Sequence, residues 1–205
     1  MEHFSFIFTI FLTLLGPVKL IPSFAGLTRG ADGRFKRDVA IRGAVIASAL
    51  CAFVALAGVI LLRRYRISTD ALRISGGLVM LIAALQVIFQ RGHPTNPHSG
   101  KPTAIQLATS PIAAPIIVPP AAVAVILTCM LLAGQNPRMT QSVAISLAII
   151  MVLDFLVMYF IDRVMRTPGL MMVLSVLGSV LIFVQVSLAI EFILHSLKSF
   201  GVIKV

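Results

Sequence analysis

The sequence predicts an all-α membrane protein with six transmembrane helices, arranged as two inverted three-helix repeats whose first helices are broken at prolines. Hydrophobic residues make up 59% of the 205 residues and charged residues only 12%, and the mean hydropathy is +1.03. A soluble chain carries about a quarter charged residues, so the composition indicates a membrane protein. Two similar proline pairs, described below, predict the repeat.

Six apolar runs account for nearly the whole chain and leave no room for a soluble catalytic domain. Each is long enough to cross a hydrocarbon core of ~30 Å, which takes ~20 helical residues. The runs cover residues 4–27, 39–62, 70–90, 103–133, 140–161 and 169–195. The first run also holds a weak cleavage-site pattern at Ser23-Phe24-Ala25. Its length, Lys19 and the absence of a basic segment before it favour a membrane span over a signal peptide.

The fourth run predicts a broken or partly re-entrant helix. No residue between Pro102 and Pro137 is charged. A straight helix over this stretch would measure about 54 Å at ~1.5 Å per residue, which is well over one bilayer. The run is also interrupted by prolines at positions 111, 115, 119 and 120.

Two proline pairs mark corresponding positions in the two halves. A shift of 98 residues places Pro17 on Pro115 and Pro22 on Pro120. Proline removes a backbone donor and frees a carbonyl, which lipid cannot satisfy. Matched breaks of this kind point to the binding site of a transporter. The predicted organisation is one membrane domain, with repeat 1 at 1–92, a connecting loop at 93–102 and repeat 2 at 103–205.

The net charge of +10 does not indicate nucleic-acid binding, because the basic residues are spread over the loops without a run of five. The first, third and fifth loops hold slightly more of them than the opposite side, which places both termini in the periplasm by the positive-inside rule. Cys51 and Cys129 lie in apolar runs and are interpreted as packing residues. His93 and His98 lie in the connecting loop at a spacing that fits no metal site.

Ionisable residues inside the spans are the sharpest candidates for function, because burying them is costly unless they are paired or hydrated. Lys19 lies between Pro17 and Pro22, and Asp154 lies near the centre of the fifth run. If the two meet, they neutralise each other at mid-membrane. A purely structural salt bridge, or Lys19 pointing into a cavity, is the alternative.

Arg73 is a further candidate, because it is followed by Gly76 and Gly77. The glycines allow close approach of a ligand or of another backbone, and Arg73 could then bind a carboxylate with two hydrogen bonds. An ion pair with Asp70 at i, i+3 is the structural alternative. The predicted substrate-binding residues are Pro17, Lys19, Pro22, Arg73, Gly76, Gly77, Pro115, Pro119, Pro120 and Asp154.

Three segments resemble the MarC family of bacterial inner-membrane proteins, also described as small neutral amino acid transporters. Residues 16–24 read Gly-Pro-Val-Lys-Leu-Ile-Pro-Ser-Phe, where the family has Asp/Asn-Pro-x-Gly-x-x-Pro-x-Phe. Residues 111–121 read Pro-Ile-Ala-Ala-Pro-Ile-Ile-Val-Pro-Pro-Ala, where it has Pro-Leu-Ala-x-Pro-Leu-x-x-Gly-Pro-Gly. Residues 67–77 read Ile-Ser-Thr-Asp-Ala-Leu-Arg-Ile-Ser-Gly-Gly and are the most specific match, to Ile-Ser-x-x-Ala-x-Arg-Ile-x-Gly-Gly.

The departures from these patterns concern the two breaks. Lys19, Pro119 and Ala121 replace family glycines, and Gly16 replaces an Asp or Asn. If relatives couple transport to Na⁺ or H⁺, the Lys19 ammonium could take the place of that cation.

The resemblance implies a multi-pass transporter or exporter in a bacterial inner membrane. It would move small molecules, with small neutral amino acids as the expected substrate, by alternating access, with no cofactor. A non-transporting scaffold or a channel-like protein is the alternative, and a homo-oligomer is compatible with either. An enzyme is not expected, because no His lies at the centre of a span.

Overall fold

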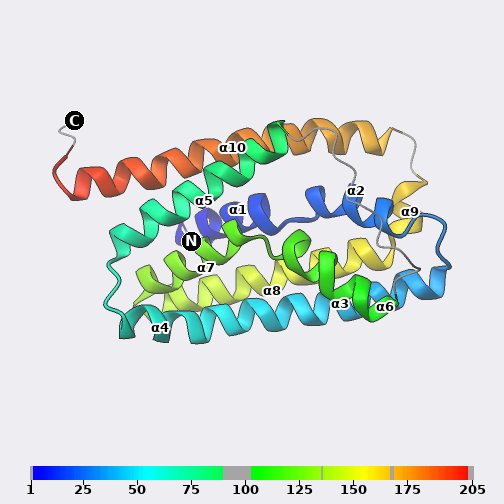
Figure 1. The fold of residues 1–205 in the computed structure, drawn as a ribbon, viewed down its shortest axis with the longest axis horizontal. Helices are drawn as coiled ribbons and strands as arrows, with labels where there is room; N and C mark the ends of the chain where they lie inside the picture. Colours follow the sequence, from blue (N-terminus) through cyan, green and yellow to red (C-terminus); the bar gives the residue numbers. More distant parts are fainter. Residues whose placement is uncertain (1, 90–102, 135, 167–168, 203–205) are drawn as a thin grey trace.

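The computed structural model describes residues 2–89, 103–134, 136–166 and 169–202, and all of its regular structure is helical (Figure 1). The elements of the first half are α1 (Glu2–Leu15), α2 (Pro17–Leu27), α3 (Gly33–Phe53), the π-helical turn η1 (Val54–Gly58), α4 (Val59–Arg64) and α5 (Thr69–Phe89). Those of the second half are α6 (Ala104–Leu107), the π-helical segment η2 (Ala108–Ile117), α7 (Pro120–Ala133), α8 (Pro137–Tyr159), α9 (Ile161–Met165) and α10 (Leu170–Ser199). The predicted connecting loop, with His93 and His98, lies outside the described residues.

The apolar runs become helices long enough to cross a membrane, as predicted. Five helical units meet this description: Phe4–Leu27, Gly33–Arg64, Thr69–Phe89, Pro137–Tyr159 and Met172–Ser199. The fourth run forms a bent pair instead, in which Ala104–Ile117 and Pro120–Ala133 meet at 60°. The described chain therefore has five candidate spans, or six if the bent pair counts as one.

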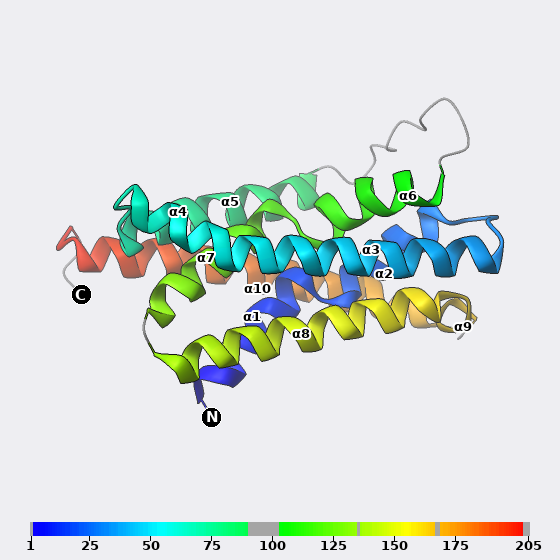
Figure 2. The same cartoon turned by 90° about the horizontal axis from the view of Figure 1, so that it is seen from below.

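Consecutive spans run in opposite directions along the bundle, and α1 begins at the end where α10 finishes (Figure 1). Two helix pairs form the flanks, α3 with α8 and α5 with α10, and the two broken spans lie between them. In the second view, α6 lies on one side of α3 and α8 lies on the other, while α7 crosses behind them from the α6 side toward the start of α8 (Figure 2). Both broken spans are thereby held at the centre of the molecule, where lipid cannot reach all of their backbone.

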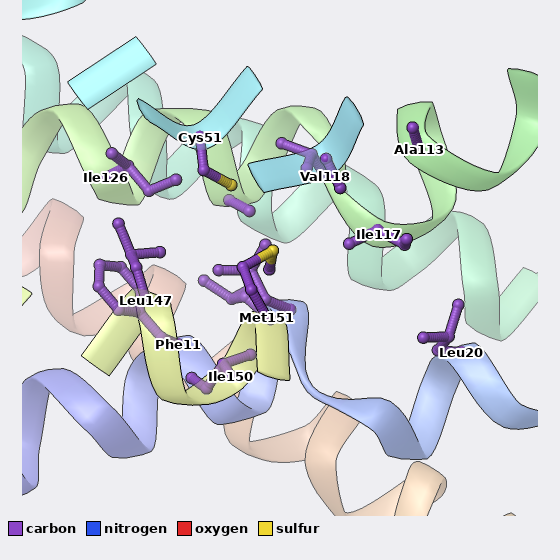
Figure 3. Packing of buried hydrophobic residues seen from close by; sticks show 14 of the residues in the cluster. Phe11, Leu20, Cys51, Ala113, Ile117, Val118, Ile126, Leu147, Ile150 and Met151 are labelled. Atoms are coloured by element: carbon purple, nitrogen blue, oxygen red, sulfur yellow. The ribbon is translucent and has the colours of Figure 1, made fainter. Parts of the chain in front are cut away.

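The core is formed largely by the broken spans and α8. Ile117 and Val118 of the second broken span lie across the core from Met151 of α8, while Phe11 and Leu20 come from the first (Figure 3). The outward side chains are also apolar, because this bundle faces hydrocarbon rather than water. Examples at opposite flanks are Phe53, 68% exposed, and Phe183, 74% exposed.

Candidate functional site

The first break is a single extended residue between two helices. α1 ends at Leu15, Gly16 has φ −64° and ψ 161°, and α2 begins at Pro17. The residue before a proline is driven out of the helical region, and proline fits the first helical position, where its missing donor costs nothing. The sequence therefore breaks the chain here for a local steric reason.

Pro22 was expected to share in this break, but it lies inside α2. A proline within a helix removes the hydrogen bond to the carbonyl four residues earlier without necessarily ending the helix. The carbonyl of Val18 therefore lacks its usual helical donor. The first span therefore has an extended residue at Gly16 and, two residues later at Val18, a carbonyl without its helical donor.

The second break is longer and repeats the same steric rule. Ser110 (φ −142°, ψ 126°) and Ala114 (φ −135°, ψ 124°) are extended inside η2, and each precedes a proline. Val118, before Pro119, leaves the helical region as well. Pro119 then caps α7 with φ −70° and ψ 157°, and Pro120 is the first residue of that helix. The prolines at 111, 115 and 119 thus act on the residue before them, and the fourth run is broken as the sequence predicts.

Lys19 is held by a polar contact between three helices. Its Nζ donates a hydrogen bond to Oε1 of Gln185 on α10 at 2.6 Å. Nε2 of the same Gln185 donates to the carbonyl of Met80 on α5 at 3.0 Å. Gln185 is only 4% exposed, so this chain of bonds fixes the ammonium beside the first break. Gln185 is not among the predicted site residues, although a lone amide in an apolar span is itself a signal of a partner.

Asp154 is buried on α8 without a partner. The side chain is 1% exposed, and neither carboxylate oxygen has a hydrogen bond within the described residues. Ser146, two turns earlier on the same helix face, is also buried with an unpaired hydroxyl. The ion pair considered for Lys19 and Asp154 is not formed: the Lys19 ammonium donates to Gln185 instead, and both oxygens of Asp154 lack a partner among the described residues. Among the described residues, no group of three His, Cys, Asp or Glu side chains could hold a metal ion.

Arg73, Gly76 and Gly77 are in contact with other parts of the protein. Nη1 of Arg73 lies 3.5 Å from Oδ1 of Asp70, and Oγ of Ser199 donates to the other oxygen of Asp70 at 3.0 Å. A Cβ on Gly77 would come within 2.7 Å of the Ala189 carbonyl on α10, and one on Gly76 would meet Ala124 of α7 at 3.4 Å. The close approach that these glycines allow is thus between helices.

The structure brings the first break and Lys19 together with Gln185, but it leaves Arg73 paired with Asp70. A cavity of about 830 Å³ lies elsewhere, between α3 and α8, and no predicted site residue lines it. Its walls carry the small residues Ala44, Ser48, Ala52, Ala144 and Ala148. Their four-residue spacing is the sequence signal by which this groove could have been found.

Comparison with known proteins identifies relatives over nearly the full length. A family model described as MarC family integral membrane protein matches residues 1–200. The UPF0056 membrane protein MJ1677 of Methanocaldococcus jannaschii is 24% identical over 93% of this chain and 96% of its own length. The UPF0056 membrane protein YvbG of Bacillus subtilis is 25% identical over 90% and 92%.

A relative from Escherichia coli K12, the UPF0056 inner membrane protein YhgN, is 24% identical over 67% of this chain and 68% of its own length. No solved structure matches the chain.

Proposed function

The chain belongs to the MarC family of integral membrane proteins, and from this premise we propose that it is a secondary transporter of small molecules that works by alternating access. The observation that carries the proposal is the pair of broken helices at the centre of the bundle, one of them beside a half-buried ammonium group. Broken helices of this kind supply the binding groups in transporters whose substrates sit near the bilayer midplane.

A zwitterionic amino acid suits the groups at the two breaks. The N-termini of α2 and α7, at Pro17 and Pro120, carry partial positive charge that attracts a carboxylate. The Lys19 ammonium adds a full charge to the first of these. The Val18 carbonyl, freed by Pro22, accepts a hydrogen bond from a substrate ammonium. Small neutral amino acids are therefore the proposed substrate class.

The packing of the helices supports two inverted repeats. α1 and α2 pack on α8, and correspondingly α6 and η2 pack on α3. α7 packs on α5, while α1 packs on α10. The remaining pairs, α3 with α8 and α5 with α10, each join corresponding helices. We therefore place a pseudo-two-fold axis in the membrane plane, with alternating access as a rocking of one repeat against the other.

We also propose a bacterial inner membrane as the location, following the name of the E. coli relative. The first loop carries Arg29 and the start of α3 carries Arg34, Lys36 and Arg37. The positive-inside rule puts this end in the cytoplasm and both termini in the periplasm. Reporter fusions to each terminus test this orientation.

A non-transporting scaffold is the second candidate, and one observation favours it. The cavity of about 830 Å³ is lined by α3, α8 and Met130 rather than by the breaks. A transporter in an occluded state would also lack an open site at the breaks. The transporter and the scaffold are therefore distinguished by measuring flux and not by this conformation.

The experiment is uptake and exchange of radiolabelled alanine, glycine and serine in proteoliposomes, with and without sodium or proton gradients. Wild-type protein is compared with Lys19→Ala and, as a matched control, with Lys198→Ala at the exposed end of α10. We expect saturable uptake that Lys19→Ala abolishes or makes dependent on a cation, and that Lys198→Ala preserves. Absence of flux for every amino acid, with the protein folded and inserted, would favour the scaffold.

A further inference from the structure

A groove open to the lipid runs along the flank formed by α3 and α8. Its walls extend from Ile41 on α3 to Leu56 on η1 and from Thr140 to Phe155 on α8, enclosing about 830 Å³. Fifteen helical steps at ~1.5 Å each make it about 22 Å long. One leaflet of a bilayer core is about 15 Å deep, so the groove can hold a whole acyl chain lying along the helices.

The lining of the groove is apolar. Val45 and Val152 stand at its rim, 63% and 55% exposed, and Cys51, Leu147 and Met151 form its floor. Among the lining residues, only Ser48 and Thr140 carry hydroxyl groups. An amino acid would leave its charges unpaired here, whereas a hydrocarbon chain would not.

Basic residues lie at one end of the groove. Arg37 precedes Ile41 by one helical turn, and its guanidinium lies 5.2 Å from the centre of the Tyr159 ring, one turn beyond Phe155. Arg34 lies a turn earlier on the same face and is exposed. This cation–π contact places the guanidinium about one helical turn beyond the lined end of the groove.

These two arginines differ from the other basic groups nearby. Lys36 is paired with Asp162 at 2.6 Å and Arg42 with Asp38 at 2.8 Å. Within the described part of the chain, neither Arg34 nor Arg37 has a carboxylate partner. The end of the apolar groove therefore carries positive charge that the protein itself does not neutralise.

We propose that this groove is a binding site for an anionic phospholipid, with one acyl chain between α3 and α8 and the phosphate on Arg37 and Arg34. Guanidinium groups bind phosphate through paired charge-assisted hydrogen bonds. Basic pockets beside membrane helices recognise anionic headgroups in this way. The site is independent of the transport proposal, because it uses none of the groups at the breaks.

A second copy of the chain is the competing occupant, and charge disfavours it. Two copies in one membrane share an orientation, so a two-fold interface through this groove would have its axis along the membrane normal. The interface would bring Arg34 and Arg37 of both copies together at the same end. Like charges at an interface oppose association, whereas an anionic lipid is attracted by the same residues.

The absence of tryptophan allows a direct test by fluorescence. Phe155→Trp places a single reporter in the groove, and Phe183→Trp places one on the exposed face of α10 as the matched control. Each protein is reconstituted in bilayers that contain brominated-chain phosphatidylglycerol or brominated-chain phosphatidylcholine. Val152→Trp at the rim of the groove replaces Phe155→Trp if the latter fails to fold, as judged by circular dichroism and gel filtration.

We expect phosphatidylglycerol to occupy the groove on the order of 25-fold in preference to phosphatidylcholine, about fivefold for each of the two arginines, while Phe183→Trp shows no preference. Adding Arg34→Gln and Arg37→Gln to Phe155→Trp should abolish the preference. Equal quenching by both lipids in the groove would overturn the proposal. A groove tryptophan that neither lipid quenches would also overturn it and would point to a second copy.

Discussion

The two broken spans both interrupt a helix at the centre of the bundle, but they carry different chemical groups at the interruption. The first, α1 with α2, is interrupted at Gly16 and carries Lys19 just beyond the break. The second, α6 with η2 and α7, is extended at three separate positions and has no charged residue from 103 to 133. The residue 98 positions after Lys19 is Ile117, which is 1% exposed in the core. Full positive charge is thus confined to one break, and the other presents only backbone.

This difference extends to the last helix of each half. Gln185 on α10 is buried and bridges Lys19 to Met80. Gln86, its counterpart near the end of α5, is exposed. A buried amide is stable only when its donors and acceptors are satisfied, and only Gln185 faces an ammonium. Lys19 in the first span thus has its partner 166 positions later in the chain, on the last helix, and the corresponding helix of the first half has no such contact at Gln86 among the described residues.

The largest expected effect comes from removing that partner. Gln185→Leu should lower the free energy of unfolding by about 3 kcal/mol, because the Lys19 ammonium loses a charge-assisted bond inside the bundle. Gln86→Leu is the matched control and should change stability by less than about 0.5 kcal/mol. Thermal unfolding in detergent measures both. Equal effects of the two substitutions would contradict the asymmetry described above.

The positions of the spans were readable from the sequence, whereas the partners of the polar residues were not. The third run was predicted at 70–90 and is found at Thr69–Phe89, and the fifth was predicted at 140–161 and is found at Pro137–Tyr159. Such runs are visible because lipid demands ~20 apolar residues in a row. The predicted inverted repeat and the binding roles stay predictions.

Local rules also explain where the prediction of the breaks succeeded and failed. Each break in the second span follows from steric exclusion before a proline. Pro22 does not follow this rule, because α2 continues through it, with Leu20, Ile21 and Phe24 buried on either side. The Lys19–Asp154 pair was inferred from the cost of each charge alone, and no local pattern indicates that Gln185 lies nearer to Lys19. Contacts between distant segments depend on packing that periodicity does not encode.

The glycines of the third and sixth spans provide a second comparison between the halves. Gly77→Ala should destabilise the protein by about 2 kcal/mol, because the new methyl group would collide with the backbone of α10. Gly178→Ala should be tolerated, since nothing lies within 4 Å of the position a Cβ would take. Chemical unfolding of both variants in mild detergent is the measurement. Tolerance of Gly77→Ala would mean that α5 and α10 are not closely packed in the membrane.

A substitution of Asp154 should affect the free energy of unfolding and the transport activity in opposite directions. Its carboxyl is buried without a hydrogen-bond partner, so Asp154→Leu should raise the free energy of unfolding by about 1–2 kcal/mol. Transport should be lost in the same variant if the carboxyl binds substrate or a coupling cation. Asp162→Asn, which breaks the exposed contact with Lys36, is the control and should cost less than about 1 kcal/mol. A stabilised variant with full transport would assign Asp154 no role at the site.

The smallest effect tests the carbonyl that Pro22 leaves free in the first span. Pro22→Ala restores an amide donor to the Val18 carbonyl, so stability should rise by about 1 kcal/mol. Pro120→Ala is matched in position by the 98-residue offset, but Pro120 is the first residue of α7, where no helical bond is regained. Its effect on stability should therefore be close to zero. If the Val18 carbonyl contacts substrate, uptake by Pro22→Ala should fall while its unfolding temperature rises, a combination that a purely structural proline would not produce.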